Sequence, residues 1–427
     1  MERIDIDQLA EPLRDAARNI ASTLREAGHE AWIVGGAVRD LAMGLVPGDV
    51  DLATEATPDR LEQLFPGSLG VGRAFGTLIV PARTQGGRVD VELTTFRRDG
   101  ESSDARRPDR VDYGVSLEED ARRRDFTMNA LFLDPLSGEV RDPTGGLDDL
   151  RRRVLRTVGD PNERFEEDAL RLLRLARFAG RYAFTIERKT REAASRHAPL
   201  LDHVSRERMA SEWRKAASHR GFATVLQVAG EIGLLEIAAP GAGSDLGQRV
   251  SLAQALEAGE QKVGSETAFA VLFDPLVRLG DESAIQSAAG ALATLRPSRA
   301  ESAEVIALWS LAGRLGEFER APRPRAEAIR IARAKFSEPA LRYARARNVV
   351  LQEPTLAAIE RVDTLRLGPQ TELRPKPLLS SKDLIAAGIQ PGPALGRWIA
   401  ALEDRQLEGE LSDRASALAF VRSALED

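Results

Sequence analysis

The chain has 427 residues, 43% of them hydrophobic, and a formal net charge of −6, so its length predicts roughly two to four domains with substantial cores. It contains no cysteine and only four histidines, which excludes disulfide bonds and thiolate zinc sites and leaves oxygen ligands for any metal. No long apolar run is present and the first thirty residues mix acids with bases, so we predict neither a membrane span nor a secretory signal.

The first part of the chain predicts a small α/β domain. Residues 7–28 place apolar side chains at helical spacing and predict an amphipathic helix. Residues 57–65 predict a further helix, which we expect Thr57 to cap ahead of Pro58. Short apolar runs between glycine turns predict strands at residues 31–34, 77–82 and 89–96.

The next segment joins this domain to a different kind of structure. Ser116 and Glu119 form a capping box, which predicts a helix that runs to about Ala130. Residues 134–138 then predict a turn between two short strands.

Strand signals nearly vanish from about Gly145 onward. Residues 147–365 are rich in alanine, leucine, arginine and glutamate at helical spacing, which predicts an elongated helical body. Several prolines between residues 322 and 377 indicate linkers or helix ends before a final helical segment.

Two short motifs in the first domain indicate phosphate and metal chemistry. Gly35 and Gly36 follow an apolar strand and open a helix, so backbone amides there can face phosphate, with Arg39 placed to neutralise it. A glycine pair alone is more often only a tight turn. Asp49 and Asp51 stand at i and i+2, which on a strand lets both carboxylates share a cation, although such a pair also occurs by chance on solvated loops.

The alternating strand at residues 88–95 can add a third carboxylate. It places Asp90 and Glu92 on one face and apolar residues on the other, a pattern that an ordinary half-buried strand also shows. If this strand lies beside that of Asp49, Glu92 or, with less support, Asp90 completes the three-carboxylate cluster used for two-metal nucleotidyl transfer.

Taken together, the motifs resemble the class II tRNA nucleotidyltransferases, the family of bacterial CCA-adding enzymes and poly(A) polymerases. The motifs that carry the resemblance are GGAVRD at residues 35–40, DVD at 49–51, RRDFTMNA at 123–130 and EDALR at 167–171. Segments similar to the family's hinge, neck and tail motifs lie at residues 146–150, 156–159, 205–215 and 382–396. Residues 220–370 match only in helical character.

The resemblance implies an α+β fold, with an N-terminal nucleotidyltransferase (polymerase-beta-like) α/β head followed by an elongated all-helical neck, body and tail. The expected parts are a catalytic head at 1–144, a nucleotide-selecting neck at 145–220, a helical body at 221–365 and a helical tail at 366–427. It further implies a cytoplasmic enzyme that adds CCA to the tRNA 3' end from CTP and ATP with Mg²⁺, without a membrane partner. The oligomeric state stays open.

Individual roles also follow from the resemblance. Asp49, Asp51 and Glu92 are the expected catalytic residues and metal ligands. Arg124 and Asp125 are expected to hold phosphate and ribose, with Asp125 accepting a hydrogen bond from the 2'-hydroxyl. The full expected nucleotide-binding set is Gly35, Gly36, Arg39, Arg124, Asp125, Asn129, Asp168, Arg171, Arg174 and Arg177.

Asp168 and Arg171 are expected to read the base. At i and i+3 they would be adjacent on one helix face, one offering acceptors and the other donors. Cytosine and adenine both present an amino donor beside a ring-nitrogen acceptor, so one such pair can select both. The alternative is an ordinary surface salt bridge. Residues 151–189 contain eleven basic and six acidic side chains, which indicates a track for the RNA backbone or simply a solvated charged surface.

Related activities remain as alternatives. Residues 97–110 form a charged loop that CC-only enzymes are understood to lack, so the loop disfavours that activity but not an A-adding enzyme that completes CC-ended tRNA. Residues 72–77 resemble the tRNA enzymes more than bacterial poly(A) polymerases. A non-catalytic RNA-binding protein would be expected to lose an acidic ligand or the Asp168 and Arg171 pair, and all are present.

Overall fold

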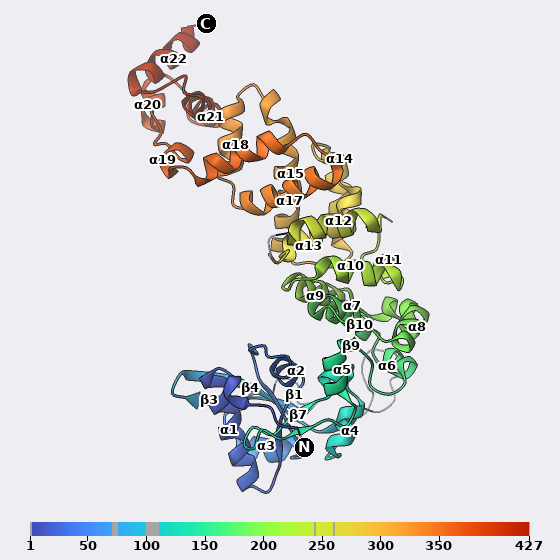
Figure 1. Cartoon of the computed structure of the whole chain (residues 1–427). Coiled ribbons are helices and arrows are strands. Elements are labelled where there is room, and N and C mark those ends of the chain that lie inside the picture. Colours follow the sequence, from blue (N-terminus) through green and yellow to red (C-terminus); the bar gives the residue numbers. More distant parts are fainter. Residues whose placement is uncertain (1, 71–75, 100–110, 243–244, 259–260, 427) are drawn as a thin grey trace. The chain divides into compact units, whose positions relative to one another are not determined.

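The computed structural model describes residues 2–70, 76–99, 111–242, 245–258 and 261–426, and the chain divides into two compact units. Unit 1 comprises Met1–Glu212 and Thr224–Ala238, and unit 2 comprises Trp213–Ala223 and Ala239–Asp427. A mixed sheet lies in the N-terminal part and helices make up most of the remainder, which confirms the expected α+β fold (Figure 1). None of the described helices combines the length and apolar character needed to cross a membrane.

Six strands of unit 1 form the central sheet, in the order β3-β4-β2-β1-β7-β8. Only β2 and β4 run parallel, while the other neighbouring pairs are antiparallel. The strands are β1 (Ala31–Val34), β2 (Asp51–Thr54), β3 (Thr77–Thr84), β4 (Gly87–Thr95), β7 (Phe132–Leu133) and β8 (Val140–Arg141). The three strands predicted from apolar runs are therefore confirmed, as is the turn at residues 134–138.

Helices flank this sheet in the head. They are α1 (Glu11–Glu26), α2 (Gly36–Ala42), α3 (Pro58–Leu64) and α4 (Leu117–Arg122), with a 3₁₀ turn η1 (Ile6–Gln8) before them. Helix α1 packs on β1, β3 and β4, and α2 packs on β1. Thr57 precedes α3 as expected, but its side chain forms no capping hydrogen bond. Pro58 occupies the first helical position, where its fixed φ favours the helix start.

The helix that starts at Ser116 is shorter than predicted. Its capping box is confirmed, but the helix ends at Arg122 instead of near Ala130. The chain leaves the helical conformation because Phe126 is extended and forms a β-bridge with Thr157, far along the sequence. A 3₁₀ turn, η3 (Thr127–Asn129), follows.

The rest of unit 1 is helical apart from one small sheet. Its helices are α5 (Gly146–Arg152), α6 (Pro161–Glu167), α7 (Leu170–Tyr182), α8 (Arg188–His197), η4 (Ala198–His203), the first part of α9 (Arg206–Ala217), most of α10 (Phe222–Glu231) and α11 (Leu235–Ala238). The neck is not wholly helical as expected, since β9 (Val154–Leu155) pairs in parallel with β10 (Thr185–Ile186). Ala183, with φ 52°, ends α7 and turns the chain into β10.

Two predicted segments fall partly outside the described residues. The strands β5 (Arg97–Asp99) and β6 (Val111–Tyr113) pair with each other, and residues 100–110 of the expected charged loop lie between them but are not described. Residues 72–75, which belong to the segment compared with poly(A) polymerases, also lie outside the described part.

Unit 2 has its own core. Its helices are α12 (Leu246–Glu257), α13 (Ser265–Leu272), η5 (Asp274–Leu276), α14 (Glu282–Ala293), α15 (Arg299–Glu317), η6 (Phe318–Arg320), α16 (Pro324–Ala332), α17 (Ser337–Leu351), α18 (Leu356–Leu367), α19 (Gln370–Leu373), α20 (Ser381–Ala386), α21 (Pro393–Glu408) and α22 (Arg414–Glu426). Between them Asp274 is fully buried and accepts hydrogen bonds from Tyr343 and Arg347.

We expect Gly146→Ala to lower the free energy of unfolding by about 1–3 kcal/mol through overpacking. A Cβ at this position would stand 2.2 Å from the carbonyl oxygen of Thr127, which is backbone and cannot rotate away. Gly290→Ala on α14 is the control, since its Cβ would meet open space, and it should raise stability by up to about 1 kcal/mol. Urea unfolding followed by circular dichroism measures both, and equal effects would contradict the close packing at Gly146.

Candidate active site

The turn between β1 and α2 permits close approach to the backbone. Gly35 has φ 67° and ψ −124°, a conformation that residues with a Cβ rarely adopt. Helix α2 begins at the next residue, Gly36, and the N–H groups of a first helical turn have no partners within the helix. The predicted order of strand, glycine turn and helix is therefore confirmed.

Arg39 lies next to this turn but is buried. Its guanidinium is 3.4 Å from where a Cβ on Gly36 would stand, and the residue is only 4% exposed. It donates hydrogen bonds to Asp40 at 2.8 Å and to Asn129 at 2.6 Å, and it lies over the ring of Tyr182 at 4.6 Å from the centroid. The positive charge of Arg39 therefore lies beside the glycine turn and is already paired with Asp40.

Two acidic side chains meet on adjacent strands of the sheet. Strands β2 and β4 run parallel with Asp51 opposite Glu92, which confirms the predicted proximity of the two strands. Asp49 lies two residues before Asp51, and all three side chains reach solvent. Protein atoms nevertheless crowd Asp51, and this desolvation, together with the charges of Glu92 and Asp49, raises its pKa to about 7 against the opposing effect of Arg124.

This set of oxygen donors fits a hard divalent cation, because a cation between the carboxylates would remove the repulsion that adds to desolvation in raising the pKa of Asp51. In the part of the chain that the structure describes, no three acidic or histidine side chains already converge into a metal-binding group. The candidate metal site around Asp51 and Glu92 is therefore only partly formed by protein ligands. Asp90, the weaker candidate, accepts a 2.8 Å hydrogen bond from Arg88 instead.

A buried carboxylate holds Arg124 beside the acidic pair. Asp120 is fully buried and forms ion pairs with Arg124 at 2.8 Å and with Arg123 at 2.6 Å. Burial alone would raise the pKa of Asp120, but the two arginines hold it below its ordinary value. The Arg124 guanidinium is 3.7 Å from a Cβ position on Gly35, and its charge lowers the pKa of Asp51, so it serves both parts of the site.

Asp125 has both carboxylate oxygens occupied. Oδ1 accepts hydrogen bonds from the amide of Phe126 at 2.8 Å and from Asn129 at 3.0 Å, while Oδ2 accepts one from Arg174 at 2.7 Å. Burial would raise the pKa of Asp125, yet the charge of Arg174 and these hydrogen bonds hold it at about 2. The expected contact with a ribose hydroxyl would use the remaining lone pairs of this carboxylate.

Asp168 does not share a helix face with Arg171, so that prediction is wrong. Helix α6 ends at Glu167, and Asp168 has an extended backbone with φ −150° and ψ 101° before α7 begins. Its carboxylate accepts a hydrogen bond from the N–H of Leu170 at 3.1 Å, which satisfies a free donor at the start of α7. The other oxygen accepts a hydrogen bond from Arg208 on α9 at 2.8 Å.

Arg171 binds α6 and the head rather than Asp168. It donates hydrogen bonds to Glu167 at 2.6 Å and to the carbonyl oxygens of Arg164 and Arg123, both at 2.8 Å. These bonds leave the Nε hydrogen and one Nη2 hydrogen of the Arg171 guanidinium for a further acceptor. The structure thus brings Asp168 and Arg171 to the same helix start, each with its own partner.

The last two expected arginines on α7 also bind protein carboxylates. Arg174 pairs with Asp125, as described above. Arg177 is 6% exposed and donates a 2.6 Å hydrogen bond to the buried Glu212 of α9, and it lies over the ring of Phe178 at 4.1 Å from the centroid. Arg177 therefore fixes α7 to α9.

Residues 31–156 match the poly A polymerase head domain. Residues 183–246 match a second family model, described as the probable RNA and SrmB-binding site of polymerase A. The two matches cover the head and part of the region after it, and they confirm the resemblance seen in the motifs.

Individual CCA-adding enzymes are similar to this chain in sequence and in structure. The CCA-adding enzyme of Geobacillus stearothermophilus is 44% identical over 218 residues, which are 51% of this chain and 53% of the relative, so the chain spans about half the length of the curated relatives it matches. The solved structure of the Bacillus stearothermophilus CCA-adding enzyme in complex with CTP has a TM-score of 0.76 and 28% identity and covers 98% of both chains. The Thermotoga maritima CCA-adding enzyme complexed with tRNA shares the fold, with a TM-score of 0.69, 18% identity and full coverage of both chains.

Several residues that hold the site in place were not predicted from the sequence. They are Asp120, Glu167, Arg208 and Glu212. Two of them had a signal, since Asp120 precedes Arg124 by four residues and Glu167 precedes Arg171 by four, the spacing of ion pairs on a helix. Arg208 and Glu212 lie in the segment 205–215 that resembles the neck motif, but they are far along the chain from their partners, so no local spacing indicated those ion pairs.

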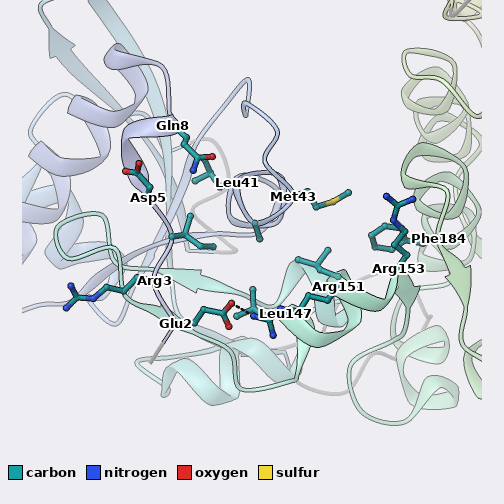
Figure 2. A pocket seen from close by; sticks show the side chains of 13 residues that line it. Glu2, Arg3, Asp5, Gln8, Leu41, Met43, Leu147, Arg151, Arg153 and Phe184 are labelled. Carbon is teal, nitrogen blue, oxygen red and sulfur yellow. Dashed lines mark hydrogen bonds and ion pairs between the residues drawn. The ribbon is translucent and has the colours of Figure 1, made fainter.

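A separate cavity of about 540 Å³ lies at the C-terminal end of α2, away from the glycine turn. Figure 2 shows Met43, Arg151, Arg153 and Phe184 around it, with Arg151 bound to Glu2. None of the expected site residues is among the described residues that line this cavity. The cavity is therefore distinct from the candidate active site.

We expect the affinity of the protein for Mg²⁺ to rise about tenfold per pH unit up to about pH 7 and then to level off, because Asp51 must lose its proton to bind a cation. Isothermal titration calorimetry at several pH values measures this. Asp51→Asn should weaken binding and flatten the profile, whereas Asp90→Asn should change neither. A wild-type affinity that does not vary with pH would contradict the raised pKa.

Proposed function

We propose that this chain is a template-independent nucleotidyltransferase that adds the 3'-terminal CCA of tRNA from CTP and ATP. The observation that carries the proposal is the register that sets Asp51 beside Glu92, on strands next to the Gly35 turn. The similarity to CCA-adding enzymes, one of them solved with CTP, supports these substrates.

The acidic pair and the glycine turn have complementary tasks in this reaction. The tRNA 3'-hydroxyl would attack the α-phosphate of the nucleotide, a phosphodiester bond would form, and pyrophosphate would leave. Asp49, Asp51 and Glu92 would hold Mg²⁺, which when bound supplies activation of the hydroxyl and neutralises the leaving group. The amides after Gly35 and the Arg124 guanidinium, which lies beside that turn, would bind the triphosphate.

Base selection would fall to the start of α7. Cytosine and adenine present an amino donor beside a ring-nitrogen acceptor, so the carboxylate of Asp168 would accept from the amino group and Arg171 would donate to the ring nitrogen. Asp168 keeps acceptor lone pairs beyond its bonds to Leu170 and Arg208. Arg171 keeps donors beyond its bond to Glu167 and those to the backbone.

The other expected residues would act around this pair. Asp125 would bind the ribose 2'-hydroxyl, and Asn129 and Arg174 would orient Asp125, because both bind its carboxylate. Arg39 would add positive charge behind Gly36, and Arg177 would anchor α7 through its partner carboxylate on α9.

We extend the proposal to the whole chain. The basic excess of residues 151–189 would contact the tRNA backbone. The functional parts would be a catalytic head at 1–144, a nucleotide-selecting neck at 145–220, a helical body at 221–365 and a helical tail at 366–427. An enzyme that matures tRNA in this way would act in the cytoplasm.

The first experiment incubates the protein and Mg²⁺ with tRNA that ends at the discriminator base, at C or at CC, with single nucleotides and with CTP and ATP together. We expect completion to CCA followed by a stop, resolved on a sequencing gel. Addition of a single A to CC-ended tRNA alone would instead indicate an A-adding enzyme, and long A tails on any RNA would indicate a poly(A) polymerase. No addition to any RNA would overturn the proposal in favour of a non-catalytic RNA-binding protein.

Substitutions can distinguish the residues that the reaction requires from those that select the base. Asp49→Ala and Asp51→Ala should each reduce incorporation of every nucleotide by at least about 10³-fold, because the metal ligands serve the reaction itself. Arg171→Ala should retain incorporation but raise the share of UTP and GTP that is added. Asp90→Ala and Arg88→Ala, both on solvent-exposed side chains of β4, are matched controls that should behave as wild type. Unchanged selectivity in Arg171→Ala would refute the assignment of base reading.

A further inference from the structure

Besides the bond of Arg171 to the carbonyl oxygen of Arg123 at its start, helix α7 has two side-chain attachments to the head. In its middle, Arg174 binds Asp125, which lies in the segment after α4. At its C-terminal end, the hydroxyl of Tyr182 donates a 3.0 Å hydrogen bond to Oδ1 of Asp40 on α2, and Arg181 approaches Oδ2 of the same carboxylate at 3.4 Å. All of these residues belong to unit 1.

The two attachments are joined within the head by a continuous chain of hydrogen bonds. Asp125 accepts one from Asn129, whose side-chain oxygen accepts one from Arg39, which in turn donates to Asp40. Each member of the chain is 8% exposed or less. The polar groups between α7 and the head are therefore fixed from one attachment to the other in a setting with little water to compete.

The second attachment lies close to the turn that would bind the triphosphate. Asp40 stands four residues after Gly36, one helical turn from the backbone amides that would bind the triphosphate. Tyr182 stands at the opposite end of α7 from Arg171, and the helix of 13 residues is about 20 Å long. The bonds of Arg171 and Arg174 hold the first two turns of α7, and a contact at the far end limits rotation of the helix about them.

We infer that Tyr182 and Asp40 are positioning residues, which together hold the base-reading start of α7 at a fixed distance from the phosphate-binding turn of α2. This inference rests on the proposed function, since it concerns the two parts of the same nucleotide site. Neither residue touches the nucleotide in this role. Each acts through the helix that it fastens.

The chemistry of the contact suits a permanent attachment. Burial, with the nearby Asp40 charge, raises the pKa of Tyr182 well above its ordinary value, so the hydroxyl stays protonated and donates to the carboxylate at any physiological pH. The Arg39 guanidinium lies over the Tyr182 ring and pairs with Asp40, so both partners of the hydrogen bond are held by a third group.

Unit 2 offers a matched control. There the hydroxyl of Tyr343 also donates to a buried carboxylate, that of Asp274, which pairs with Arg347, and the arginine again lies near the tyrosine ring. Tyr182→Phe and Tyr343→Phe thus remove the same atom from two similar triads, and only the first triad lies between α7 and α2.

The test measures single-turnover addition of A to CC-ended tRNA over a range of ATP concentrations, with thermal unfolding of each variant. We expect Tyr182→Phe to lower the maximal rate by about tenfold with little change in the ATP concentration at half-maximal rate, because a small misplacement costs rate more than binding. Tyr343→Phe should stay within about twofold of wild type in rate, despite a similar fall in unfolding temperature. Equal rates in the two variants would reduce Tyr182 to a structural residue and overturn the inference.

A second measurement separates failure of this inference from failure of the proposed function. Hydrogen exchange of the free protein should show faster exchange at the first turn of α7 and in α2 for Tyr182→Phe, but not for Tyr343→Phe. If wild type adds no nucleotide to any tRNA, the proposed function fails, and exchange alone then decides whether the attachment exists. Unchanged exchange in Tyr182→Phe would refute the attachment even in an active enzyme.

Discussion

The repulsion between Asp51 and Glu92, held opposite each other on β2 and β4, is the constraint around which the head is arranged. Two like charges in register destabilise a sheet unless something nearby offsets them. Arg124 provides part of that offset, and it stays in place because Asp120 is buried and binds it. The cost of burying Asp120 is met in turn by a second arginine, Arg123.

Other buried charged residues of the head and of α7 are also paired with opposite charges. Arg39, Asp125 and Arg177 are each nearly inaccessible to solvent, and each is paired with a group of opposite charge. Removing one partner from such a pair leaves an uncompensated charge, which is far more destabilising than losing the pair as a whole. The expected nucleotide-binding residues are therefore also structural residues, and their substitution will combine effects on folding and on catalysis.

The sequence predicted the parts of this site that depend on local patterns. Alternating and apolar runs located β1, β3 and β4, and the alternation in β4 placed Glu92 on the polar face that meets Asp51. The glycine pair correctly located the start of α2. In each case the period of a strand or the conformational freedom of glycine determines the structure within a few residues.

The failures arose where distant residues decide the local conformation. The helix after Ser116 stops early because Phe126 bridges Thr157, a contact that no local period reveals. Asp168 leaves the helix because two helices meet there, and Arg208 from α9 then binds its free oxygen. The partner of Arg39 was likewise not visible in the sequence, since Asn129, which accepts its hydrogen bond, stands ninety positions away.

The raised pKa of Asp51 has a consequence for the head when no cation is bound. A carboxyl group whose pKa rises from 3.8 to about 7 on folding retains its proton over that interval, while the unfolded chain has already released it. Like a bound cation, this proton offsets the negative charge of Asp51, and it thereby weakens the repulsion between Asp51 and Glu92. Above about pH 7 this proton is lost, and Arg124 then offsets only part of the repulsion between the charged carboxylates of Asp51 and Glu92.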